Sequence, residues 1–370
     1  MVNPRIRYLV SSPCGDIPAE KDKWDLPLEC DQLKTPYGVY FHSINDFLSR
    51  EGFRPLIDAA SKKLGRKIHI KEINEIIIRT EKHGLLYHPA SIELILKEGK
   101  VKFGLNVAVS EFGKDCLKKE FSILKKLYIK FNLPYLPEVY YLIEQNSMVF
   151  LLEEWFEGYH EFHISQNENG KTLLKLWEFG KGYKYLSTEQ SFEIFKQASK
   201  ILTLYYDFDN YCQIQPWHHA AGDFIAKIED EVIDVRLTTA RQYEPFMVFR
   251  DKEKINPVLA LLYFLLILSI RMRLDKLDGL GKIIWIEDYC VEATVTGFLE
   301  ALKLRDEFSL HLGSEDEFLM LIQSFDKKDL KTVFEPLLEI YSGTEDFPVI
   351  IENIGNHIGK LYTAIQNLPS

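Results

Sequence analysis

Hydrophobic and polar residues alternate with a period of two from Arg66 to about residue 111. Turn residues divide this pattern into three consecutive runs, at residues 68–80, 90–100 and 101–111. Alternation over such short runs is typical of half-buried strands. Because short turns join the three runs, we expect an antiparallel meander.

The period changes to that of a helix between Gly113 and Phe131, where apolar residues recur on one face and lysines on the other. Two further strand-like runs follow, at residues 138–145 and 147–156, before Gly158. The predicted order is therefore three strands, one helix and two strands.

Beyond Gly158 the pattern is mainly helical, apart from one predicted hairpin. We expect an α+β protein with an N-terminal extension at residues 1–65, a strand-rich region at 66–157 and a mostly helical region at 158–370. The extension contains one expected helix, at residues 43–64. The later helices are expected at residues 188–206, 258–273, 286–304, 315–324, 328–341 and 349–366.

The predicted hairpin belongs to the segment 215–234, QPWHHAAGDFIAKIEDEVID. Asp223 opens its first strand, Asp234 comes from the apolar second strand, and His218 and His219 lie in the loop before it. Carboxylate oxygens are the ligands that Mg²⁺ prefers, so the two aspartates are candidate ligands for a metal that presents a nucleotide phosphate. A plain β-hairpin can produce the same pattern.

This order of elements resembles the protein-kinase-like superfamily, and most of all its aminoglycoside phosphotransferase and choline kinase branch, with degenerate catalytic motifs. The resemblance covers about residues 66–310. It implies a two-lobed fold, with an N-lobe of five antiparallel strands and one helix and a mostly helical C-lobe. Residues 216–223 take the place of the family's catalytic loop, HGDxHxxN, and Ile233-Asp234 takes the place of the strand end that follows it.

The resemblance assigns roles to the residues of the loop and hairpin. Asp223 stands at the loop asparagine and Asp234 at the second aspartate, both of which hold Mg²⁺ in the family. His218, with His219 beside it, occupies the position of the aspartate that orients the acceptor hydroxyl. An imidazole accepts a proton near neutral pH, so these histidines are the candidate catalytic residues. In the alternative interpretation they only hold and pack the loop.

In the N-lobe, the family has a third-strand lysine that contacts the nucleotide phosphates and pairs with a helix glutamate. Asn106 stands at the lysine position and Glu120 at the glutamate position. Lys82 and His83, at the tip of the first hairpin, are expected to supply the missing positive charge, unless that tip is simply solvated. Lys102 shares a strand face with Asn106 but lies four residues earlier, roughly 13 Å away.

Two further groups complete the candidate nucleotide site. The linker around Glu153, Glu154 and Trp155 resembles the family's hinge, whose backbone reads the edge of adenine. Arg236 and Arg241 follow the second aspartate and suit bidentate contact with a phosphate, or else they pair with carboxylates of the chain.

Two functions from different classes are consistent with these residues. One is an atypical phosphotransferase that uses ATP or GTP with Mg²⁺ and acts on a small-molecule hydroxyl. The other is a pseudokinase, a catalytically inactive module that binds a ligand or regulates a partner. The paired carboxylates favour the first, whereas Asn106 and His218 favour the second.

Composition narrows the classes of partner. A net charge of −10 and a pI near 5.6 argue against a general nucleic-acid binder, which needs a basic face to displace counterions. The resemblance implies a small molecule or a nucleotide as the ligand. With 46% hydrophobic residues, the chain has enough apolar side chains for well-formed cores.

The remaining signals argue for a cytoplasmic protein. Its 5 cysteines are scattered and form no CxxC pair, so we expect neither disulfides nor a zinc site. The N-terminus does not resemble a signal peptide, and the uncharged run at residues 255–270 is too short for a comfortable membrane span and predicts a buried helix. His160 and His163 are three residues apart, as metal ligands on one helix face can be, but a structural role is expected for both.

Overall fold

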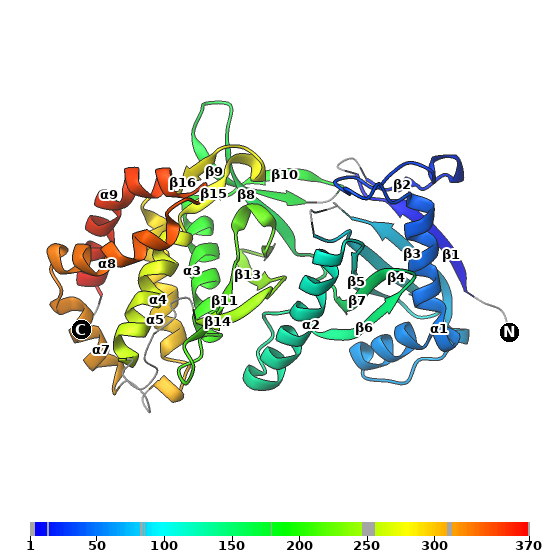
Figure 1. The fold of residues 1–370 in the computed structure, drawn as a ribbon, viewed down its shortest axis with the longest axis horizontal. Helices are drawn as coiled ribbons and strands as arrows, with labels where there is room; N and C mark the ends of the chain where they lie inside the picture. Colours follow the sequence, from blue (N-terminus) through cyan, green and yellow to red (C-terminus); the bar gives the residue numbers. More distant parts are fainter. Residues whose placement is uncertain are drawn as a thin grey trace. The chain divides into compact units, whose positions relative to one another are not determined.

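A computed structural model describes residues 4–12, 15–81, 84, 86–178, 180–245, 256–308 and 313–368 (Figure 1). Contacts between residues divide the chain into two compact units. Unit 1 comprises Met1–Glu157 with Phe179–Gly182, and unit 2 comprises Gly158–Glu178 with Tyr183–Ser370. Each unit is described by itself.

Unit 1 is built on a seven-stranded sheet in the order β2-β1-β3-β4-β5-β7-β6. All neighbouring strands are antiparallel except β1 and β3, which are parallel. The strands are β1 (Arg5–Val10), β2 (Ile17–Pro18), β3 (Ile73–Thr80), β4 (Ala90–Leu96), β5 (Lys100–Ala108), β6 (Val139–Gln145) and β7 (Met148–Glu154).

Two helices cover opposite faces of this sheet (Figure 1). Helix α1 (Tyr37–Leu64), which has a non-helical break at residues 50–53, packs on the face that carries Phe103 and Phe150. Helix α2 (Glu111–Phe131) packs on the other face, where Ala108 and Leu151 point, because successive residues of a strand face opposite sides. The sheet is therefore covered on both sides where α1 and α2 pack.

The predicted meander, the helix after it and the two strands that follow are confirmed as β3, β4, β5, α2, β6 and β7. The expected number of strands in this sheet is wrong, because β1 and β2 extend it from five to seven. Residues before position 66 therefore supply two strands and a core helix to unit 1.

Unit 2 contains a five-stranded sheet in the order β10-β9-β8-β12-β13. Its strands are β8 (His160–Gln166), β9 (Thr172–Glu178), β10 (Gly182–Tyr185), β12 (Phe224–Glu229) and β13 (Val232–Leu237). Two small sheets pair β11 (Cys212–Gln215) with β14 (Gln242–Pro245), and β15 (Leu274–Lys276) with β16 (Ile283–Trp285). Strands β8, β9 and β10, between Gly158 and the first helix of this unit, were not among the predicted elements.

The helices of unit 2 agree with the expected ranges to within a few residues. They are α3 (Thr188–Leu204), α4 (Pro257–Arg271), α5 (Tyr289–Leu302), α7 (Glu315–Ser324), α8 (Lys327–Tyr341) and α9 (Phe347–Gln366). Helices α3 and α5 lie closely side by side at Gly297, where an added Cβ would come within 2.0 Å of the Lys196 carbonyl oxygen. Glycine is required there because two backbones meet.

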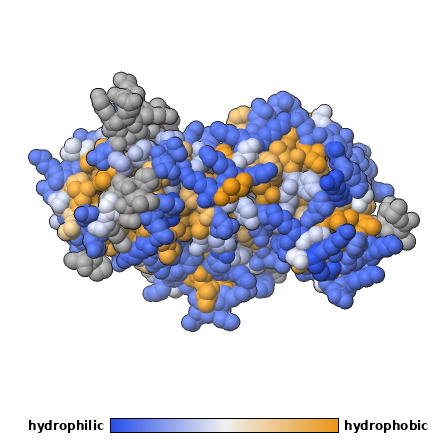
Figure 2. All heavy atoms as spheres, turned by 90° about the horizontal axis from the view of Figure 1, so that it is seen from below, coloured by the Kyte–Doolittle hydropathy of each residue, from blue (hydrophilic) through white to orange (hydrophobic). Residues whose placement is uncertain are grey.

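The uncharged run that predicted a buried helix forms α4, most of whose residues are buried. In the part of the chain that the structure describes, no helix combines the length and the apolar character needed to span a bilayer. The face of the molecule in Figure 2 is largely hydrophilic, with hydrophobic residues gathered in separate small areas.

Candidate functional site

The hairpin of β12 and β13 places the two candidate aspartates. Its turn consists of Asp230 and Glu231, both with positive φ, and this two-residue turn fixes which residues lie opposite one another. Asp234 lies opposite Lys227. Thr238 lies opposite Asp223, whose carbonyl oxygen accepts a hydrogen bond from the Thr238 amide at 2.8 Å.

Asp223 is buried, and both oxygens of its carboxylate accept hydrogen bonds. Both of its carboxylate oxygens accept hydrogen bonds from the guanidinium of Arg241, at 3.0 and 2.8 Å, and one also accepts the backbone amide of His218 at 2.9 Å. The Asp223 side chain is only 2% exposed. This carboxylate therefore fixes the loop before β12 to the segment after β13.

Asp234 has its own partners on the same face of the hairpin. It accepts a hydrogen bond from the Tyr159 hydroxyl at 2.6 Å and pairs with the guanidinium of Arg236. That guanidinium also lies 5.3 Å from the centre of the Tyr159 ring. Arg236 and Arg241 thus form the ion pairs that the sequence left as one of their two possible roles.

The shared magnesium site expected for Asp223 and Asp234 does not fit this register. The two positions are four residues apart along the hairpin, roughly 13 Å at the rise of a strand, so one ion cannot contact both carboxylates. Among the described residues, no group of three or more His, Cys, Asp or Glu side chains is arranged to hold a metal. Asp234 therefore does not lie opposite Asp223 on the hairpin; the residue in that position is Thr238.

The two candidate catalytic histidines differ in environment. His219 is 1% exposed and packs among the rings of Phe195, Trp217 and Phe224, and burial lowers its pKa to about 3. An imidazole that stays neutral in this setting has a packing role. His218 caps the short helix after it, since its Nδ1 atom accepts the Ala220 amide at 3.0 Å, and burial lowers its pKa as well.

In unit 1, Asn106 stands where the resemblance implies a lysine, and its side chain is hydrogen-bonded to a carboxyl group. The Asn106 side chain of β5 donates to Glu153 Oε1 of β7 at 2.8 Å. Burial raises the pKa of Glu153 well above its usual value, and the charge of the buried Glu120 on α2 raises it further. Tyr87 donates its hydroxyl to Glu120 at 2.9 Å. Two carboxyl groups and an amide thus occupy the place where the family has a lysine and one glutamate.

The expected hinge residues are engaged within unit 1. The Trp155 carbonyl oxygen accepts the Lys63 ammonium at 3.2 Å, and the Glu154 amide donates to the Glu138 carbonyl at 2.8 Å. Glu153 lies against Gly104, where an added Cβ would come 3.2 Å from its Cγ. The Lys102 ammonium lies 3.9 Å from the centre of the Trp155 ring. The Trp155 carbonyl and the Glu154 amide, two of the backbone groups predicted to read adenine, are thus bonded within unit 1.

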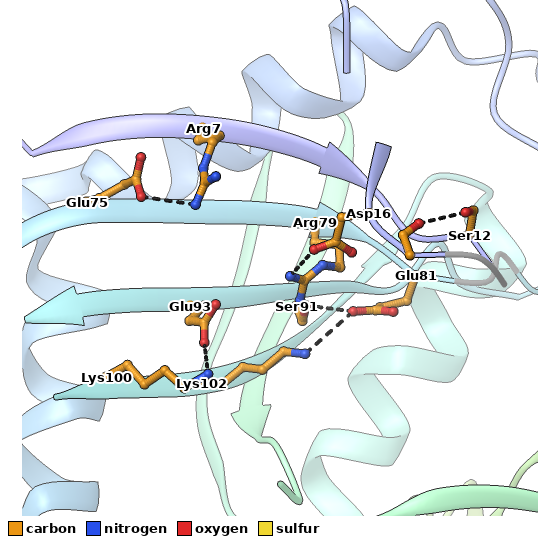
Figure 3. Close-up of polar contacts among 11 residues, drawn as sticks. Arg7, Ser12, Asp16, Glu75, Arg79, Glu81, Ser91, Glu93, Lys100 and Lys102 are labelled. Atoms are coloured by element: carbon orange, nitrogen blue, oxygen red, sulfur yellow. Dashed lines mark hydrogen bonds and ion pairs between the residues drawn. The ribbon is translucent and has the colours of Figure 1, made fainter. Parts of the chain in front are cut away.

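Lys102 also belongs to a row of charged side chains on the sheet of unit 1 (Figure 3). Glu81 is the centre of this row: it accepts the Ser91 hydroxyl at 2.6 Å and lies 3.9 Å from Lys102. Burial raises the pKa of Glu81 and lowers that of Lys102. The flanking pairs are Arg79 with Asp16, Arg7 with Glu75, and Lys100 with Glu93. Each cation in the figure thus faces an anion of the same unit.

Two further pairs of residues were predicted from the sequence, one in the first hairpin and one after Gly158. Lys82 and His83 lie outside the described residues. His160 and His163 lie in strand β8, not in a helix, so a separation of three puts their side chains on opposite faces. They therefore do not form the helix-face pair of a metal site.

Sequence reasoning left pairing of Arg241 with a carboxylate open but did not identify Asp223 as the partner, and it missed the bond between Asn106 and Glu153. The first follows from the hairpin register, and the second from the pairing of β5 with β7, in which Gly104 lies opposite Glu153. Neither pairing is visible as a local sequence signal. Comparison of this chain with protein-family models and with curated proteins gave no match.

Proposed function

We propose that this protein is a kinase-like binding or regulatory module that does not transfer phosphate. The order of elements supports the kinase-like part: in unit 1 a helix follows the third of the five strands β3, β4, β5, β6 and β7, and in unit 2 a polar loop and a hairpin follow α3. Because likeness of fold grants no activity, turnover has to be judged from individual residues.

The observation that carries the proposal is the engagement of Asp223. Phosphoryl transfer in this fold depends on Mg²⁺ held by two oxygen ligands at the loop and at the strand end. Here both oxygens of Asp223 are bound by Arg241, whose positive charge also repels a metal ion, and the residue opposite is Thr238. A magnesium ion would have to displace a nearly buried ion pair.

The cluster around Asn106 supports the same conclusion. The lysine of the family neutralises nucleotide phosphates, whereas Asn106 is neutral and bonded to Glu153. The carboxyl groups of Glu153 and Glu120 make the potential at this position negative or, when protonated, neutral. Neither state attracts a triphosphate.

The active phosphotransferase is the second candidate, because of His218. Burial lowers the pKa of this histidine, so its imidazole is neutral near pH 7 and can accept a proton. Because its Nδ1 atom accepts the Ala220 amide, the neutral ring carries its proton on Nε2, which has no hydrogen-bond partner among the described residues. To act as the base of a phosphotransferase, His218 would use Nδ1 and give up the bond to Ala220.

Thermal unfolding with ATP or GTP, each with and without Mg²⁺, separates the two candidates. We expect no Mg²⁺-dependent rise in Tm, whereas a nucleotide at 100 times its Kd would stabilise the fold by about 2.7 kcal/mol. A Mg²⁺-dependent rise that Asp223→Asn abolishes, or nucleotide hydrolysis lost in His218→Ala, would overturn the proposal.

The Arg241→Gln variant tests the ion pair itself. It leaves the nearly buried Asp223 carboxylate without its main partner, so we expect the free energy of unfolding to fall by about 3 kcal/mol in urea titrations. The double variant Asp223→Asn, Arg241→Gln should regain part of that loss, since no charge is left unpaired. Lys331→Gln, on an exposed position of α8, is the matched control. Equal stability of Arg241→Gln and wild type would contradict the structural role of the pair.

A further inference from the structure

The two edge strands of the sheet in unit 2 differ in what bonds to their outer backbone groups. At one edge, the Gln197 side chain of α3 bonds to the backbone of β13: its amide donates to the Ile233 carbonyl at 2.7 Å and accepts the Val235 amide at 3.0 Å. At the other edge, β10 has β9 as its one strand neighbour among the described residues. An edge strand presents backbone groups that another strand can pair with.

The pairing of β10 with β9 shows which backbone groups point outward. The Leu186 amide donates to the Leu174 carbonyl at 2.8 Å, so the residues that alternate with Leu186 face β9. Tyr183 and Tyr185, which lie between them, direct their amide and carbonyl groups away from the sheet. These outward groups can bond to an added strand.

Aromatic side chains surround this edge on one face. Trp177 and Tyr183 are 40% and 56% exposed, and their ring centres are 5.4 Å apart. The Lys175 ammonium lies 4.6 Å from the Trp177 ring and 4.9 Å from the Tyr183 ring, and Asp278 binds it at 2.7 Å. The rings are therefore held in place by a fixed cation while much of their surface faces solvent.

The positive charge of the β9–β10 hairpin indicates the kind of partner that fits this edge. Residues 171–185 contain four lysines and one glutamate; Lys175 pairs with Asp278 and Lys184 with Glu178, so the segment together with Asp278 keeps a net positive charge in a chain whose net charge is −10. A second copy of the chain pairing edge to edge would bring lysines against lysines, which disfavours self-association. A negatively charged strand is complementary to this edge.

We propose that the edge of β10 at Tyr183–Tyr185, with the exposed Trp177 ring beside it, is a docking site for an acidic, extended segment of a partner protein. The segment adds to the sheet as a strand, its backbone bonds to the outward groups of both tyrosines, and its carboxylates approach the lysines of the hairpin. This site does not depend on whether unit 2 transfers phosphate.

A protein segment suits this edge better than a single-stranded nucleic acid, although aromatic rings and lysines are common to both kinds of site. The outward amides and carbonyls alternate as a strand requires, and bases cannot satisfy that pattern.

Fluorescence anisotropy with the full chain tests the proposal. The probes are a labelled heptapeptide of alternating Glu and Val, the same peptide with Lys in place of Glu, the Glu peptide with alternate amides methylated, and oligothymidylate. We expect the Glu peptide to bind and to weaken with salt, and the Lys peptide and the methylated peptide to bind at least about tenfold more weakly. No binding of the Glu peptide, equal binding of the methylated peptide, or preference for oligothymidylate would overturn the proposal.

Protein variants locate the site. Tyr183→Pro removes one outward amide, which an edge strand tolerates, and we expect about tenfold weaker binding of the Glu peptide. Tyr183→Thr keeps the amide and should lose less, whereas Val232→Thr, at the start of β13, should leave binding unchanged. Unchanged affinity in Tyr183→Pro would contradict the site. If that variant does not fold, the methylated peptide decides the question with the wild-type chain.

Discussion

His357 is a buried histidine of unit 2 that makes stability depend on pH. Its Nε2 atom lies 2.9 Å from the Ser269 hydroxyl oxygen, its ring packs against Trp285 and Phe334, and burial lowers its pKa to about 3. Between pH 6.5 and about 3 the unfolded chain therefore binds a proton that the folded chain does not. Stability from this residue is complete above pH 6.5 and falls as the pH drops, by about 1.4 kcal/mol per pH unit.

The His357→Gln variant keeps a side chain that can bond to Ser269 but does not titrate. Urea unfolding at about pH 7 and about pH 5 should show roughly 2 kcal/mol less pH dependence than wild type. The exposed His42→Gln is the control for replacing a histidine by glutamine outside the core. Burial raises the pKa of Asp275 to about 6, so this residue makes the folded state more stable as the pH falls, opposite to His357. The quantity to compare is therefore the difference in pH dependence between His357→Gln and wild type. Identical pH profiles of His357→Gln and wild type would rule out this assignment.

At the scale of elements, Gln197 joins helix α3 to the sheet by taking the place of a neighbouring strand. Gln197→Met keeps the length of the side chain but leaves the Ile233 carbonyl and the Val235 amide without this partner. We expect the free energy of unfolding to fall by about 2 kcal/mol, since each net hydrogen bond contributes about 1 kcal/mol. Urea titration measures the change, with Lys331→Met on the exposed face of α8 as control. A loss no larger than that of the control would show that solvent replaces Gln197.

Elements with local patterns were predictable from the sequence, and those with distant partners were not. Strands β3, β4 and β5 alternate and are joined by short turns, so their pairing could be predicted. Strand β8 buries polar residues, His163 and Ser165, which hide its alternation. The register of β12 with β13 depends on a turn at Asp230 and Glu231 that contains no glycine. Without that signal the sequence could not show that Thr238, not Asp234, lies opposite Asp223.

At the scale of the whole molecule, residues before position 66 belong to the core of unit 1. The ring of Phe47 in α1 stacks on Phe150 of β7, with ring centres 5.1 Å apart and planes within 3°, and both residues are 0% exposed. The sequence could suggest only that this segment packs on the strand-rich region after it. Alternation in β1 indicates a strand but does not show that it pairs with β3, which lies about 70 residues later.

Phe47→Ala tests this placement. Removing a fully buried ring should lower the free energy of unfolding by about 3–5 kcal/mol, as measured by urea titration or by Tm. Val39→Ala, at a position of the same helix that is 47% exposed, should change it by less than about 0.5 kcal/mol. A small effect of Phe47→Ala would mean that α1 is an appendage to unit 1.

The parallel pairing of β1 with β3 also affects the order in which strands can join the sheet during synthesis. Arg5 lies beside Glu75, so about 70 residues separate the partners, whereas β3, β4 and β5 follow one another through short turns. On the ribosome, β1 is made first but has no strand to join until β3 has emerged. Closing so long a loop costs entropy that the local hairpins do not pay, so β1 enters the sheet only after β3, although β1 is made earlier.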